Sequence, residues 1–186
     1  ATTEPHKVPA TILSRCQILN LLPSDRNSVK EEVLEKGVSI DDCEILSTLF
    51  TNVEAIMSNL EDETYKLCKD CLFDTLDALE QSTYKGLFYA QSELVSKIKT
   101  KEQARLYLDL LAIAFKDVLL YQMEQDITLE VYKSTISNIA KNVKGVDKIY
   151  SEIMLSRGKI ESNISISLLL EHIFIKMIQG GNVNGK

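Results

Sequence analysis

The residues at the start of the chain are the ones whose types and spacing suit chemistry. Pro5 and Pro9 forbid a regular helix through the opening and leave residues 1–9 extended. A short helical turn is expected from Ala10 to Ser14, and it presents Arg15 at its end. The planar guanidinium of an arginine makes paired hydrogen bonds with a phosphate or a carboxylate. Position and composition alone also fit, more simply, an ordinary surface arginine.

Residues 2–17 resemble a known sequence block. They read TTEPHKVPATILSRCQ, which is similar to the sensor 1 and Ser-Arg-Cys block of the clamp-loader subunits of bacterial DNA polymerase III, the delta-prime and gamma/tau proteins. In that family the block lies late in an AAA+ nucleotide-binding domain. The resemblance implies that Thr2 or Thr3 is the sensor 1 position and that Arg15 is an arginine finger for ATP on a neighbouring subunit. Such an arginine stabilises charge on a transferring phosphoryl group.

The composition is that of an ordinary globular protein. The chain has 186 residues, of which 45% are hydrophobic and 26% charged, enough for one sizeable core or two small ones. A formal net charge of -6 argues against broad nucleic-acid binding, because phosphate contacts need a positive field. The most apolar stretch, residues 164–178, is interrupted by charged residues, so no membrane span is expected. The expected compartment is the cytoplasm.

The cysteines and histidines are the candidate metal ligands. Cys68 and Cys71 have the spacing of metal ligands. A helix places residues three apart on one face, however, so two small buried side chains explain this pair as well, and no metal site is expected. His6 fits a loop residue. His172 fits a core or interface histidine better than a catalytic one.

The sequence contains no phosphate-binding loop of the form G-x-x-x-x-G-K-[ST]. The chain is therefore not expected to bind a nucleoside triphosphate, to hold a cofactor or to act as an enzyme by itself. We interpret it as a C-terminal fragment in which residues 1–23 are a short non-helical remnant of an AAA+ domain. The resemblance implies that ATP is bound by the neighbouring subunit and that the parent belongs to the DNA polymerase III holoenzyme.

The rest of the chain predicts an all-α fold. Residues 24–62 are expected to form a small three-helix bundle that resembles the AAA+ lid. Ser28 is predicted to cap its first helix, Gly37 to end that helix, and Ser39 to cap the second, with Asp42 three residues further on.

The resemblance to the AAA+ lid places Glu54 at the position where gamma/tau proteins carry a sensor 2 arginine. A carboxylate there repels a nucleotide phosphate instead of sensing it. The resemblance therefore favours delta-prime, the subunit that does not hydrolyse ATP, over gamma/tau.

Residues 63–186 are expected to form a larger helical domain of about five to six helices. The predicted spans are 64–81, 83–97, 101–125, 128–142, 144–160 and 165–179. The domain carries many carboxylates, which are interpreted as a solvated helix face: Asp109, Asp117, Glu124 and Asp126.

Residues 163–173 resemble the closing helix of delta-prime proteins, which implies that residues 63–186 are the collar through which loader subunits hold together. If the collar interface is exposed in this chain, apolar patches on the final two helices are expected to drive association. The expected partners are the gamma/tau and delta subunits, with the sliding clamp and primed DNA reached only within the assembly. The alternatives are the C-terminal part of an ATP-hydrolysing gamma/tau subunit and a helical adaptor unrelated to replication.

Overall fold

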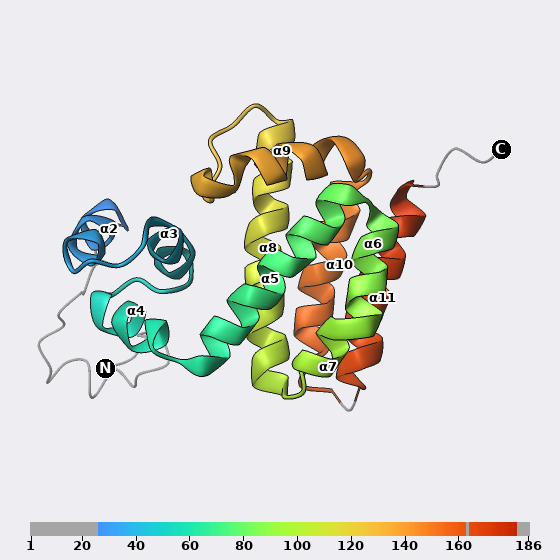
Figure 1. The fold of residues 1–186 in the computed structure, drawn as a ribbon, viewed down its shortest axis with the longest axis horizontal. Coiled ribbons are helices and arrows are strands. Elements are labelled where there is room, and N and C mark those ends of the chain that lie inside the picture. The colour runs from blue at the N-terminus through green and yellow to red at the C-terminus, as the bar shows by residue number, and fades with distance from the viewer. Residues whose placement is uncertain (1–25, 163, 182–186) are drawn as a thin grey trace, which may run out of the picture.

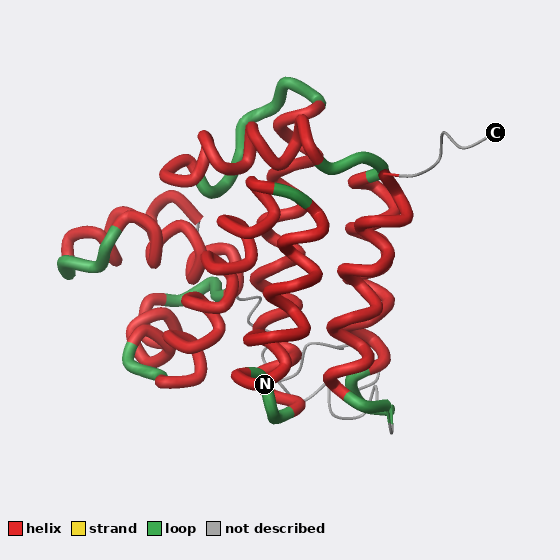
Figure 2. The backbone as a smooth tube through the Cα atoms, turned by 45° about the vertical axis from the view of Figure 1, so that its right-hand side comes forward, coloured by secondary structure: helices red, strands yellow, loops and turns green. Residues whose placement is uncertain are grey.

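The computed structural model describes residues 26–162 and 164–181 (Figure 1 and Figure 2). Within these residues the regular secondary structure is entirely helical, joined by short turns and loops. The prediction of an all-α fold is therefore confirmed. The predicted non-helical remnant, residues 1–23, lies outside the described residues.

Three short helices form a group of their own at one side of the molecule (Figure 1). They are α2 (Arg26–Glu35), α3 (Ile40–Leu49) and α4 (Val53–Leu60), and we call them the α2–α4 group. Their fully buried side chains come from all three helices: Val33, Ile45, Leu46 and Ile56. Each helix is too short to be stable alone in water, so this shared burial supports all of them.

The ends of these helices follow from local sequence signals. Ser39 caps α3, because its hydroxyl accepts a hydrogen bond from the backbone N–H of Asp42 at 3.4 Å. Gly37 follows α2 with a φ of 83°, a conformation that glycine adopts at little cost. Both predictions are confirmed. The prediction that Ser28 caps α2 is wrong, because the helix already begins at Arg26 and Ser28 lies within its first turn.

A larger bundle is built from four long helical segments. Helix α5 (Glu63–Gln81) leads into it from the α2–α4 group and crosses α8 (Lys101–Gln122), which packs against α10 (Val146–Lys159). Helix α11 (Ile166–Gly181) packs against α10 on the far side (Figure 1). Much of α8 is buried, and its fully buried members include Tyr107, Leu108, Leu111 and Phe115.

Shorter elements complete the bundle. The segment after α5 is one helical run, in which α6 (Thr83–Tyr89) passes through a π-helical turn, η2 (Ala90–Leu94), into α7 (Val95–Lys97). A 3-10 turn, η3 (Glu130–Tyr132), leads into α9 (Lys133–Asn142), which lies over one end of α8 (Figure 1). The predicted helix 128–142 therefore begins later than expected.

The loop before η3 is held by a buried carboxylate. Asp117 of α8 has a relative exposure of 0%. It accepts hydrogen bonds from the backbone N–H of Thr128 at 3.0 Å and of Leu129 at 2.7 Å. Asp117 was expected on a solvated helix face, and this expectation is wrong. A buried carboxylate is tolerated here because it satisfies backbone donors that the loop leaves unpaired.

The α2–α4 group is joined to the bundle by an ion-pair cluster. The ammonium of Lys69 on α5 lies 2.7 Å from Asp41 and 2.6 Å from Asp42 on α3. The hydroxyl of Tyr65 donates a further hydrogen bond to Asp42 at 2.7 Å. Burial by itself would raise the pKa of Asp41, but hydrogen bonds from Lys69 and Ser39 outweigh it and hold that pKa below 3.8.

Replacing Asp117 with Ala should lower the free energy of unfolding by about 3 kcal/mol, because two buried N–H groups lose their acceptor. Asp117→Asn should lose less, since its amide keeps one carbonyl oxygen. Denaturant unfolding measures both effects, with exposed Asp126→Ala as a control that should stay within about 0.5 kcal/mol of the wild type. A loss for Asp117→Ala as small as the control's contradicts this account.

Replacing Lys69 with Met should destabilise the protein by about 1–2 kcal/mol, because two half-buried carboxylates lose their shared cation. Because the native pKa of Asp41 is lowered, its stabilising contribution is present above pH 3.8 and is lost as pH falls through the native pKa. Lys69→Met should weaken this acid sensitivity, which unfolding curves between neutral and acid pH measure.

Lys66→Met is the matched control, because Lys66 lies on the same helix and pairs with exposed Glu63 at 2.9 Å. It should change stability by less than about 0.5 kcal/mol. Equal changes in the free energy of unfolding for the two substitutions would show that the Lys69 cluster adds no more stability than an exposed ion pair.

Candidate functional site

The residues predicted to meet nucleotide, Thr2, Thr3 and Arg15, lie outside the described residues, as does His6. Their roles remain predictions. The functional surfaces that the structure offers are those of the two helical groups.

Glu54 lies in the first turn of α4 and is exposed. The turn is held by Asn52, whose side chain accepts a hydrogen bond from the backbone N–H of Ala55 at 2.7 Å. Glu54 therefore presents a negative charge to solvent at the N-terminal end of the helix, where the helix dipole favours an anion.

The cysteine pair on α5 belongs to the core. Cys68 and Cys71 are both 0% exposed and unbridged, and the thiol of Cys68 donates to the carbonyl of Gln103 at 3.3 Å. Burial raises the pKa of Cys68 to about 12 and also raises that of Cys71, so both stay protonated. Within residues 26–162 and 164–181, no group of three or more His, Cys, Asp or Glu side chains is placed to hold a metal ion.

His172 is not a core residue. Its side chain is 47% exposed, and its Nε2 lies 3.4 Å from a carboxylate oxygen of Glu152 on α10. The core half of the prediction is therefore wrong, because the buried stripe of α11 runs through Leu169, Ile173 and Met177 instead. His172 lies on the outer side of α11, and the interface role of this histidine stays a prediction.

Exposed apolar side chains lie near this His172–Glu152 pair, together with Lys159, whose ammonium is 3.9 Å from Glu152. Leu168 and Ile175 lie four residues before and three after His172, which places all three on one side of α11. Leu155 follows Glu152 by three residues, so it lies on the side of α10 that faces α11. Leu168, Leu155 and Ile175 are 65%, 58% and 38% exposed. We call these three residues, with Glu152 and His172, the α10–α11 face.

The α10–α11 face rests on a rigid support. Asp109 of α8 pairs with Arg157 of α10 through both carboxylate oxygens, and Arg105 of α8 pairs with Glu161. At the other end, a Cβ added to Gly180 would lie 3.0 Å from the carbonyl oxygen of Lys144, so α11 ends tightly against the turn before α10. The arrangement can present an apolar surface, and no catalytic constellation accompanies it among the described residues.

None of the helices in the described part of the chain is both long enough and apolar enough to cross a membrane.

Comparison with known proteins gives one informative similarity. No family model matches the chain. The DNA polymerase III subunit delta' of Bacillus subtilis is 21% identical to it over an alignment of 184 residues that covers 96% of this chain and 56% of that protein. The chain thus spans about half the length of the curated relative it matches. The similarity extends through both the α2–α4 group and the larger bundle.

Some exposed residues were missed by the sequence reasoning. Tyr84 and Phe88 on α6 are 65% and 73% exposed, and neither of them was singled out from the sequence. Their spacing of four residues was the available signal, because it places both on one side of a helix.

The α10–α11 face should drive association of the chain at high concentration, since an exposed apolar patch is costly in water. The double variant Leu155→Ser with Leu168→Ser should weaken self-association about tenfold in sedimentation equilibrium. Met123→Ser is the control, because Met123 is 65% exposed at the end of α8. A wild-type chain that stays monomeric at its highest soluble concentration contradicts the prediction.

Proposed function

We propose that the chain is part of a clamp-loader subunit of a bacterial DNA polymerase III, of the delta-prime type. The observation that carries this proposal is the similarity to a delta' subunit along 96% of the chain. In this role the protein binds other loader subunits and takes part in ATP-driven loading of the ring-shaped sliding clamp onto primed DNA. It acts as an interaction protein and performs no catalysis alone.

The two helical groups support a division of labour. Helix α4 ends at Leu60 and α5 begins at Glu63, which agrees with a lid in residues 24–62 and a collar in residues 63–186. The lid would follow the remnant of the AAA+ domain in residues 1–23. The collar would bind the gamma/tau and delta subunits, and the exposed apolar side chains of the α10–α11 face supply a surface for such contacts.

Arg15 would be the chemical contribution of this subunit. Its guanidinium would reach ATP bound by a neighbouring subunit and stabilise the charge that develops during phosphoryl transfer. Thr2 and Thr3 would lie in the sensor 1 region of the same domain. Hydrolysis would then depend on assembly, because the arginine and the nucleotide belong to different chains.

The C-terminal part of an ATP-hydrolysing gamma/tau subunit is the second candidate, because residues 2–17 resemble both types. The exposed carboxylate of Glu54 favours delta-prime, since a negative charge at the sensor 2 position repels a bound phosphate. ATP turnover by the complete lone subunit would distinguish the two: clear hydrolysis supports gamma/tau.

Arg15→Ala in an intact clamp loader should leave assembly unchanged and lower DNA-dependent ATP hydrolysis at the site that Arg15 serves by a factor of about 10³. Total ATP turnover of the loader should fall only by the fraction that this one ATP site contributes. The control is Lys66→Ala, which removes an exposed cation on α5 away from the α10–α11 face and should leave hydrolysis unchanged. Wild-type hydrolysis with Arg15→Ala would remove the proposed role.

A further inference from the structure

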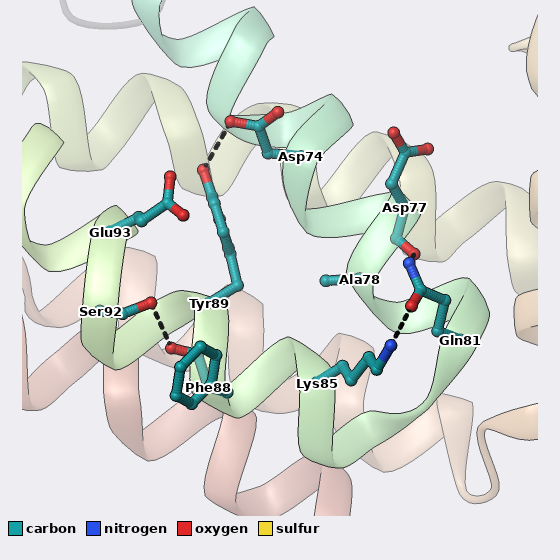
Figure 3. A pocket seen from close by; sticks show the side chains of 9 residues that line it. All are labelled: Asp74, Asp77, Ala78, Gln81, Lys85, Phe88, Tyr89, Ser92 and Glu93. Atoms are coloured by element: carbon teal, nitrogen blue, oxygen red, sulfur yellow. Dashed lines mark hydrogen bonds between the residues drawn. The ribbon is translucent and has the colours of Figure 1, made fainter.

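A groove of about 430 Å³ runs between α5 and the segment from α6 to η2 (Figure 3). Two hydrogen-bonded bridges span it. The hydroxyl of Tyr89 donates to Asp74 at 3.1 Å, and the ammonium of Lys85 donates to the side-chain oxygen of Gln81. The side chain of Ala78 lies between the two bridges, so the groove is open at its middle (Figure 3).

One end of this groove already holds a cation. The ammonium of Lys97 lies 3.0 Å from Asp74, 3.4 Å from Glu93 and 5.6 Å from the ring centroid of Tyr89. Two carboxylates and an aromatic face are a favourable setting for an ammonium or guanidinium group. The position of Lys97 thus shows that this end of the groove accommodates a cationic side chain.

The open part of the groove offers the same kind of groups, and Lys85 is the one cation in its lining. Asp77 is exposed, and no lysine or arginine of the described residues forms an ion pair with it. Lys85, the basic residue in the lining, is engaged by Gln81. Phe88 lies on the rim and is 73% exposed. A carboxylate, an exposed aromatic ring and a small apolar floor are therefore left without a partner among these residues.

The backbone of one wall departs from the regular helix. The π-helical turn η2 supplies Ser92 and Glu93, two of the residues that line the groove. Such turns are uncommon and occur frequently at functional sites. The two walls pack closely at Gly86 of α6, where an added Cβ would lie 2.5 Å from the side chain of Leu79 of α5. Helices α5 and α6 therefore cannot separate without losing this close packing. The groove is thus preformed.

We propose that this groove is a docking site for a basic segment of a partner protein, which inserts an arginine or lysine side chain between the two bridges. The cation would pair with Asp77, its hydrocarbon stem would lie over Ala78, and a neighbouring apolar residue would pack on Phe88. Charge complementarity favours this partner, because the three carboxylates of the lining outnumber Lys85 and the adjacent Lys97, and Asp77 is the one that Lys97 does not pair with. None of these residues belongs to the α10–α11 face, so the groove can be tested separately from that face.

The test uses the full 186-residue chain and a short fluorescent peptide in which arginines and leucines alternate in a helical pattern. A matched peptide carries glutamate in place of arginine. Fluorescence anisotropy should show binding of the basic peptide, no binding of the acidic one, and weaker binding as salt rises from about 0.1 M to 1 M.

Asp77→Asn should weaken the binding of the basic peptide about three- to fivefold, and Phe88→Ala should weaken it about tenfold. Both side chains are exposed, so both variants should keep their fold. The controls are Asp126→Asn and Met123→Ala, which remove an exposed carboxylate and an exposed apolar side chain outside the groove.

Three outcomes overturn the proposal. The first is failure of the basic peptide to bind the wild-type chain. The second is equal binding of the two peptides. The third is an equal loss of binding in the Asp126→Asn and Asp77→Asn variants, which would show general charge attraction without a groove. Loss confined to the groove variants supports it.

Discussion

One lysine forms the ion pairs that link the two helical groups. Lys69 of α5 holds both Asp41 and Asp42 of α3, and its ammonium also lies 5.7 Å from the ring centroid of Phe73. Phe73 in turn stacks on Tyr132 of η3, with ring centroids 4.4 Å apart. Burial would lower the pKa of Lys69, but hydrogen bonds to the two carboxylates outweigh it and raise that pKa. Partly buried ion pairs add little net stability, so the cluster fixes an orientation more than it adds free energy.

The same junction contains an opposing feature. Glu44 on α3 is only 9% exposed, and one of its carboxylate oxygens has no hydrogen-bond partner. Burial raises its pKa, and this outweighs the opposite influence of Lys30. A charged Glu44 therefore costs stability as pH rises above its ordinary range, whereas Asp41 contributes stability there. The free energy that holds the α2–α4 group against the bundle is thus a difference between opposing terms.

The larger bundle presents its two exposed surfaces on different elements. The α10–α11 face combines exposed apolar side chains with Glu152, His172 and the adjacent Lys159. The groove between α5 and α6 combines carboxylates and Lys85 with an exposed aromatic rim. Helix α10 of the first surface packs on α8, and helix α6 of the second packs on α5. Neither surface therefore needs a conformational change to form. Two preformed surfaces of different chemistry support the proposal that this subunit binds partners.

The sequence by itself determined the helices, because apolar side chains repeat with the helical period and caps such as Ser39 and Gly37 act within a few residues. It also carried the resemblance in residues 2–17, which no geometry was needed to see. Only the tertiary structure decided which polar residues are buried: Asp117 looks like any surface carboxylate until the loop at Thr128 folds back on it. The same holds for the Lys69 cluster and the groove at Phe88, since side chains distant in sequence meet there only after the helices have packed.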